Sequence, residues 1–140
     1  MDIETVRAKM AAQVSRASQS AMASVFGWVF EVQDLVVYAT LRHRRRPEST
    51  YLLRVVFDEF PRRAPSYVFV DHDTKQMTSG AWPPNVRHGA EPLGICTPGT
   101  REFHEHWHRG DAQHPWDPER YTFLATLQEI HRLMERGVGG

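Results

Sequence analysis

Four consecutive runs of strand-forming residues are the feature that most restricts how this chain can fold. Each run is rich in β-branched and aromatic residues, which favour strands, and the runs cover residues 24–32, 35–41, 50–57 and 67–71. They are joined by the pair Gln33-Asp34, by a polar loop over 43–49 and by a corner containing Pro61 and Pro65. Because connections this short join antiparallel neighbours, we predict a four-stranded antiparallel meander.

A helical pattern lies on each side of the strands. Apolar residues recur at steps of three and four over 3–22, which predicts an amphipathic helix. A second helix is predicted from about Pro118 to Arg136, with Asp117 as its N-cap. The order predicts an α+β fold. The 140 residues are expected to form one domain, 1–140, with 137–140 as a flexible tail.

The charge balance and the apolar runs exclude several classes of protein. Lys and Arg together number 17 and Asp and Glu also number 17, which argues against a nucleic-acid or membrane-surface partner. No apolar run approaches the roughly 20 residues of a membrane span. The first residues lack the basic and apolar regions of a signal peptide, and a single cysteine cannot form an internal disulfide. We therefore expect a cytoplasmic protein without a membrane partner.

The single cysteine, Cys96, lies in the strongest candidate site. Residues 73–115 lose regular periodicity, and long irregular segments within compact domains are usually functional. A lone cysteine is more often a small buried hydrophobe. Here glycine and proline stand on both sides of it, over Gly94–Gly99, and they favour a bent loop in which a thiol can face a partner.

Three short motifs in this half of the chain resemble those of a known family. Pro84-Asn85-Val86 is similar to the end of a His-Pro-Asn-Ile/Val motif, with Pro83 in the place of the histidine. Segment 94–96, Gly-Ile-Cys, resembles a Gly-x-Ile-Cys nucleophile motif, and segment 116–118, Trp-Asp-Pro, resembles a Trp-Ser-Pro helix start. With the order of elements, these motifs resemble the ubiquitin-conjugating enzyme (UBC-like) family.

The resemblance implies a thioester relay between proteins. Cys96 would accept a ubiquitin-like modifier from an adenylating activating enzyme and pass it to an amine of a target protein. Asn85 would donate an amide hydrogen to the oxyanion or brace the cysteine loop, although an ordinary turn residue is the alternative at this position. The resemblance implies neither a cofactor nor a bound metal.

The group that deprotonates the attacking amine is left open. Asp111, Asp117, His88 and His104 are candidates because they are near Cys96 in the sequence. Since Asp117 is predicted to cap a helix, Asp111 or a histidine such as His104 is favoured. Most of the eight histidines are expected on solvated loops.

The chain also departs from the family pattern. Asn85 and Cys96 are eleven positions apart, which is wider than the family spacing, and a histidine-rich stretch over 104–108 lengthens the segment before Trp116. Only one helix is predicted after the cysteine. These departures resemble the compact prokaryotic branch of the family, which occurs beside ubiquitin-like modifiers, activating enzymes and metalloprotease deconjugases in bacterial antiphage operons.

Two other functions remain open. One is a catalytically inactive module of the same fold that binds a ubiquitin-like protein, although retention of the cysteine argues against it. The other is a small metalloprotein: an extended strand would point His104, His106 and His108 to one side, where they could hold zinc. A surface loop is the simpler interpretation of that stretch. Likewise, 44–46 is interpreted as a solvated hairpin tip or as a docking patch for an acidic partner.

Overall fold

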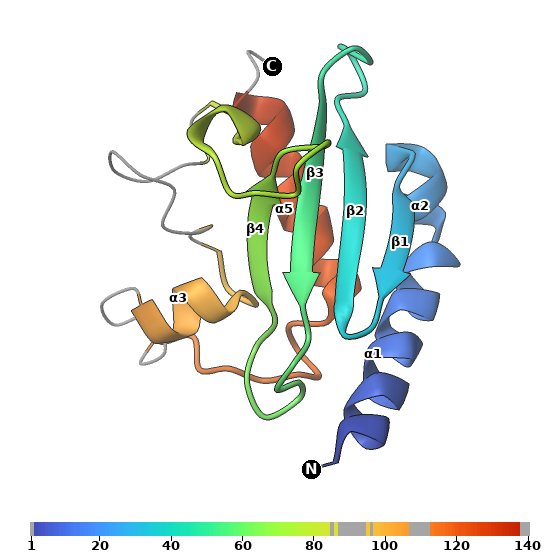
Figure 1. Cartoon of the computed structure of the whole chain (residues 1–140), viewed down its shortest axis with the longest axis vertical. Coiled ribbons are helices and arrows are strands. Elements are labelled where there is room, and N and C mark those ends of the chain that lie inside the picture. Colours follow the sequence, from blue (N-terminus) through green and yellow to red (C-terminus); the bar gives the residue numbers. More distant parts are fainter. Residues whose placement is uncertain (1, 85, 87–94, 96, 107–112, 138–140) are drawn as a thin grey trace.

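The secondary structure follows the predicted α+β order. The computed structural model describes residues 2–84, 86, 95, 97–106 and 113–137. Along the chain the elements are α1 (Ile3–Ser18), α2 (Ala21–Phe26), β1 (Val29–Gln33), β2 (Val36–Arg42), β3 (Thr50–Val56), β4 (Ser66–Val70), the short 3-10 helix η1 (Ser79–Ala81), α3 (Arg101–His106) and α5 (Phe123–Gly137) (Figure 1). In the described part of the chain, no helix is long and apolar enough to cross a bilayer.

The four strands form one antiparallel sheet in the order β1-β2-β3-β4, as predicted. Their register aligns Phe30, Ala39, Leu53 and Phe69 in a row across the sheet. Helix α5 crosses behind the sheet in Figure 1, and α1 runs along the β1 side. The side chains sealed between sheet and helix include Val37, Ala39, Leu41, Leu53, Val55, Tyr67, Phe69, Leu127, Ile130 and Met134.

The single helix predicted over 3–22 is wrong, because the chain forms two helices there. Ser20 has an extended backbone, and its hydroxyl accepts a hydrogen bond from the Ala23 N–H at 3.2 Å, so it caps a new helix. Gly27 ends α2 with a left-handed φ of 70°. The strand predicted from residue 24 therefore begins only at Val29.

The predicted start of the last helix is also wrong. Asp117 caps a turn instead: its carboxylate accepts from the Glu119 N–H at 3.0 Å, and its carbonyl accepts from the Tyr121 N–H at 2.9 Å. Helix α5 begins at Phe123, and the Thr122 hydroxyl accepts from the Ala125 N–H at 3.1 Å. A threonine five residues further on provides the cap that the aspartate was expected to provide.

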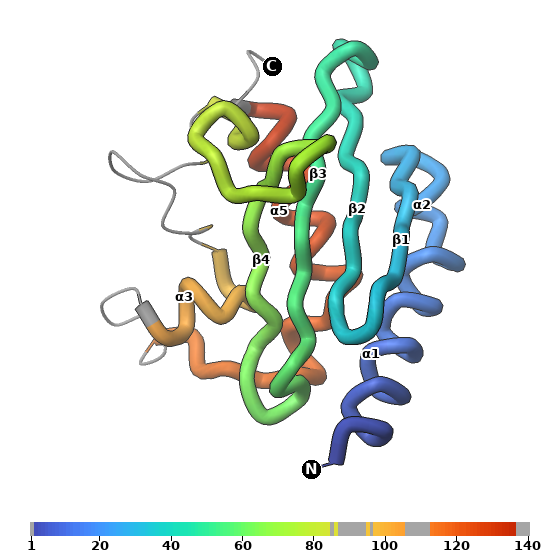
Figure 2. Tube along the Cα trace, in the orientation of Figure 1, coloured from blue at the N-terminus to red at the C-terminus, as the bar shows by residue number. Residues whose placement is uncertain are grey.

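The segment over 73–115 is less irregular than predicted, since it contains η1 and α3. Helix α3 lies beside β4 in Figure 2, and hydrogen bonds hold it at the beginning of that strand. Trp82, which follows η1, is buried with its ring 5.4 Å from that of Phe69. Both ends of this long connection therefore attach to the edge of the sheet that β4 forms.

Candidate functional site

The residues on either side of the predicted nucleophile are anchored in the core. Cys96 itself lies outside the described residues, so its predicted exposure stays a prediction. Ile95 is fully buried and Thr97 is buried, and the Thr97 N–H donates to the Ile95 carbonyl at 3.0 Å. The segment that carries the cysteine is thus fastened on both sides of position 96.

Three further candidates for this site, Asn85, His88 and Asp111, also lie outside the described residues. Val86, next to Asn85, is 4% exposed and belongs to the same hydrophobic core as Ile95. Its N–H lies 3.4 Å from the Pro83 carbonyl, which forms a turn. The two short motifs of the sequence are therefore each attached to one core by an apolar residue adjacent to the candidate functional residue.

Thr100 fixes the backbone around the cysteine position. Its hydroxyl oxygen lies 3.0 Å from the carbonyl oxygens of Ile95 and Thr97, so it donates to this pair. The same oxygen accepts from the Phe103 N–H at 3.1 Å and thereby caps α3. Because Thr100 is fully buried, water cannot replace these bonds. One hydroxyl therefore joins the cysteine segment to the start of a helix.

His104, a predicted candidate base, is buried beneath this segment. Its Nε2 accepts from the Gly99 N–H at 3.0 Å, so that nitrogen is unprotonated and already occupied. The rings of Phe103, Trp116 and Tyr121 surround it at 5.1 to 5.6 Å between centroids. In this arrangement His104 positions the Gly99 backbone.

The extended geometry considered for a metal site is wrong at residues 104–106, which lie in helix α3, and His108 lies outside the described residues. Side chains two positions apart on a helix do not face each other. Among the described residues, no group of three His, Cys, Asp or Glu side chains is placed to hold a metal ion. Three of the eight histidines in the sequence, His43, His104 and His131, are buried.

Helix α3 is tied to the proline corner and to β4. The Arg101 N–H donates to the Pro65 carbonyl at 2.8 Å, and its guanidinium donates to the Ala64 carbonyl at 3.0 Å. The buried Glu102 carboxylate accepts from the Tyr67 N–H at 3.0 Å. These bonds hold the cysteine segment against the sheet through the helix that follows it.

Tyr67 and Thr126 complete the wall behind Gly99. Burial raises the pKa of the Tyr67 phenol far above its usual range, and the nearby Thr126 hydroxyl offsets only part of this effect. Tyr67 therefore stays neutral at physiological pH. Thr126, on α5, lies directly against Gly99, whose φ is 104°.

Sequence reasoning missed Thr100 and Glu102 as parts of the site and named Gly99 only as a residue that favours a bent loop. A usable signal was present for the first two. A threonine at the N-cap position with a glutamate in the first turn is typical of a helix start. The interpretation of 73–115 as wholly irregular hid that signal.

We expect His104→Leu to lower the free energy of unfolding by about 2 kcal/mol, because the buried Gly99 N–H loses its acceptor. His104→Gln should be destabilised less, since its side-chain oxygen can accept the same hydrogen bond. Urea denaturation monitored by tryptophan fluorescence measures both. Equal losses in the two variants would show that packing, and not the hydrogen bond, is the contribution of His104.

A comparison with models of known protein families found no match, and a comparison with curated protein sequences found none either.

Proposed function

We propose that this chain is a ubiquitin-conjugating-like transferase that carries a ubiquitin-like modifier as a thioester on Cys96. The observation that supports this proposal best is the anchoring of Ile95 and Thr97 on both sides of the only cysteine in the sequence. The α+β order of N-terminal helix, antiparallel meander, cysteine segment and C-terminal helix is consistent with that family.

The proposed reaction has two exchanges. In the first, the Cys96 thiolate attacks the carbonyl carbon of the thioester between the modifier and its activating enzyme, and the thiolate of the activating enzyme leaves. In the second, a target amine attacks the new thioester, loses a proton to a base, and expels the Cys96 thiolate. A thiol with an ordinary pKa of about 8.5 provides enough thiolate near neutral pH for the first exchange.

Asn85 and Asp111 have proposed roles in the second exchange. An Asn85 amide donor to the developing oxyanion would contribute about 3 kcal/mol of barrier lowering, the typical value for one such donor. Asp111 would accept the proton of the amine. We propose that the system acts in the cytoplasm of a bacterium, within an antiphage operon, on the basis of the family resemblance.

The test is adduct formation by the purified chain with ATP and with the ubiquitin-like protein and adenylating enzyme encoded beside its gene. We expect a band on non-reducing gels that disappears with a thiol reductant. Because Cys96 is the only thiol, a reductant-sensitive adduct on this chain must be at that residue. Cys96→Ser should give an adduct that survives reductant, because an alkoxide leaves less readily than a thiolate. Cys96→Ala should give none.

Two controls make the result decisive. Circular dichroism should show that both cysteine variants keep the wild-type fold. A thiol reagent should label the native wild-type protein rapidly, since a relay cysteine must be accessible to a partner. Modifier that binds without a covalent adduct would instead support the inactive module. Conjugation at the wild-type rate by Cys96→Ala would refute the proposal.

A further inference from the structure

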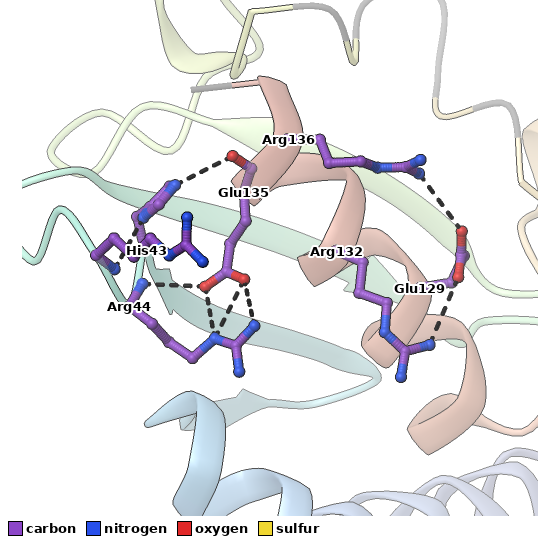
Figure 3. A pocket seen from close by; sticks show the side chains of 7 residues that line it. His43, Arg44, Glu129, Arg132, Glu135 and Arg136 are labelled. Carbon is purple, nitrogen blue, oxygen red and sulfur yellow. Dashed lines mark hydrogen bonds and ion pairs between the residues drawn. The ribbon is translucent and has the colours of Figure 1, made fainter. Parts of the chain in front are cut away.

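A pocket unrelated to the cysteine segment opens at the other end of the sheet. It has a volume of about 730 Å³ and lies between the β2–β3 hairpin and the last turns of α5 (Figure 3). Its lining is almost entirely charged: His43, Arg44, Arg45, Glu129, Arg132, Glu135 and Arg136. The cysteine segment attaches instead near the first residues of β4, so the two places are separate.

Hydrogen bonds from His43 hold the hairpin wall of this pocket in place. The Nδ1 atom of His43 accepts from the N–H groups of Arg45 and Arg46, both at 3.1 Å. Nδ1 is therefore unprotonated, and the Nε2–H donates to the Glu135 carbonyl at 3.0 Å. Because His43 is only 2% exposed, its neutral ring joins the hairpin to the helix as a buried clamp. The backbone that carries Arg45 is thus ordered before any ligand arrives.

Only one of the two glutamates in the pocket fully neutralises an arginine. The Glu135 carboxylate accepts from the backbone and guanidinium of Arg44 at 2.7 to 3.1 Å. Glu129 lies 3.9 Å from the Arg132 guanidinium and 4.0 Å from that of Arg136, too far for hydrogen bonds.

The remaining charge is positive. In the described part of the chain Arg45 forms no ion pair. Four arginines face two glutamates in the lining, so the net charge is +2 with His43 neutral. Arg132 and Arg136 are like charges four residues apart on one helix, an unfavourable spacing, and the two share the single carboxylate of Glu129. Their side chains are 55% and 69% exposed and can turn toward a ligand.

We propose that this pocket binds a small molecule that carries two or more phosphate-type charges, through Arg45, Arg132 and Arg136. Guanidinium groups bind phosphate oxygens with paired, charge-assisted hydrogen bonds, which favours phosphate over a dispersed negative surface. The volume is within the range of small-molecule sites. The ligand supplies the negative charge that Glu129 alone does not provide for these three arginines.

Pyrophosphate is the probe for this site, and isothermal titration calorimetry with the full chain measures its binding. We expect saturable binding that weakens as salt rises, and tighter binding than that of inorganic phosphate. Arg45→Gln, Arg132→Gln and Arg136→Gln should each weaken binding about tenfold, the loss of one charge-assisted hydrogen bond to the anion. Pyrophosphate should also raise the melting temperature of the wild type.

The matched control is Arg62→Gln, which removes one exposed arginine in the loop after β3, at the opposite end of the sheet from the hairpin. It changes the net charge equally and should leave the affinity unchanged. Absence of saturable binding at millimolar pyrophosphate would overturn the proposal, as would equal weakening by Arg62→Gln. Citrate binding as tightly as pyrophosphate would overturn the phosphate class. Circular dichroism checks that each variant is folded.

Discussion

Gly99→Ala should lower the free energy of unfolding by about 3 kcal/mol, the sum of a strained backbone and an overpacked contact. The φ of Gly99 is 104°, a value that residues with a Cβ rarely adopt. An added Cβ would lie 3.0 Å from Thr126 Cγ2 and 3.1 Å from its Cβ, and closer still to its hydroxyl. For a domain of this size the loss corresponds to a fall of about 10 °C in the melting temperature.

A double variant separates the two causes. Thr126→Ala removes the hydroxyl and the methyl group that the new Cβ would meet. In Gly99→Ala/Thr126→Ala, the loss of unfolding free energy due to overpacking should therefore disappear, and the loss due to backbone strain at position 99 should remain. Differential scanning calorimetry of the four proteins measures the coupling. If the losses of unfolding free energy in the two single variants simply add, steric contact between positions 99 and 126 is not a cause of the loss in Gly99→Ala. Because Gly99 and Thr100 adjoin the cysteine segment, the Gly99 variant should also lose modifier loading where the proposed activity is present.

Glu135→Gln should lower stability by about 2 kcal/mol near pH 7, because the charge of a largely buried carboxylate that accepts several hydrogen bonds is lost. Glu135 is the centre of a chain of polar contacts beneath the hairpin. Trp28 Nε1–H donates to His131 Nδ1 at 3.0 Å, and His131 Nε2–H lies 3.2 Å from the Glu135 carboxylate, which also binds Arg44. Burial tends to raise the pKa of Glu135, but the bonds from Arg44 and His131 outweigh it and lower that pKa to about 2.

The pH dependence of stability follows from these shifts. The Glu135 contribution is fully present above about pH 4.5, the pKa of an ordinary glutamate, and is lost as pH falls toward about 2. His131 adds to this effect at higher pH. Its pKa is lowered, chiefly by burial, so stability begins to fall as pH drops below the ordinary histidine value of about 6.5. The wild type should therefore lose stability over both intervals.

Urea denaturation between pH 2.5 and 8 tests this prediction. In Glu135→Gln the loss between about pH 4.5 and 2 should shrink, since the titrating carboxylate is gone. The control is Glu129→Gln on the same helix, whose exposed and distant ion pairs should contribute about 0.5 kcal/mol at most. If both variants show the same pH profile as the wild type, the Glu135 network does not contribute to acid sensitivity.

The sequence by itself determined the sheet and the position of the flanking helices. The predicted strands at 35–41, 50–57 and 67–71 match β2, β3 and β4 within one residue at each end, because β-branched residues and short connections are local signals. The last helix was identified by its apolar spacing, although its start was placed five residues early.

Only the tertiary structure decided which polar residues serve the candidate site and which are buried. Helix α3 is six residues long, too short to show a periodic pattern, and its position depends on Pro65 and Tyr67 of the distant sheet edge. The Glu135 network joins residues about ninety to one hundred positions apart, as in the pair Trp28 and His131. Spacing along the chain carries no information about such contacts. They are stabilised only after elements that are distant in sequence have packed together and excluded water from the polar groups between them.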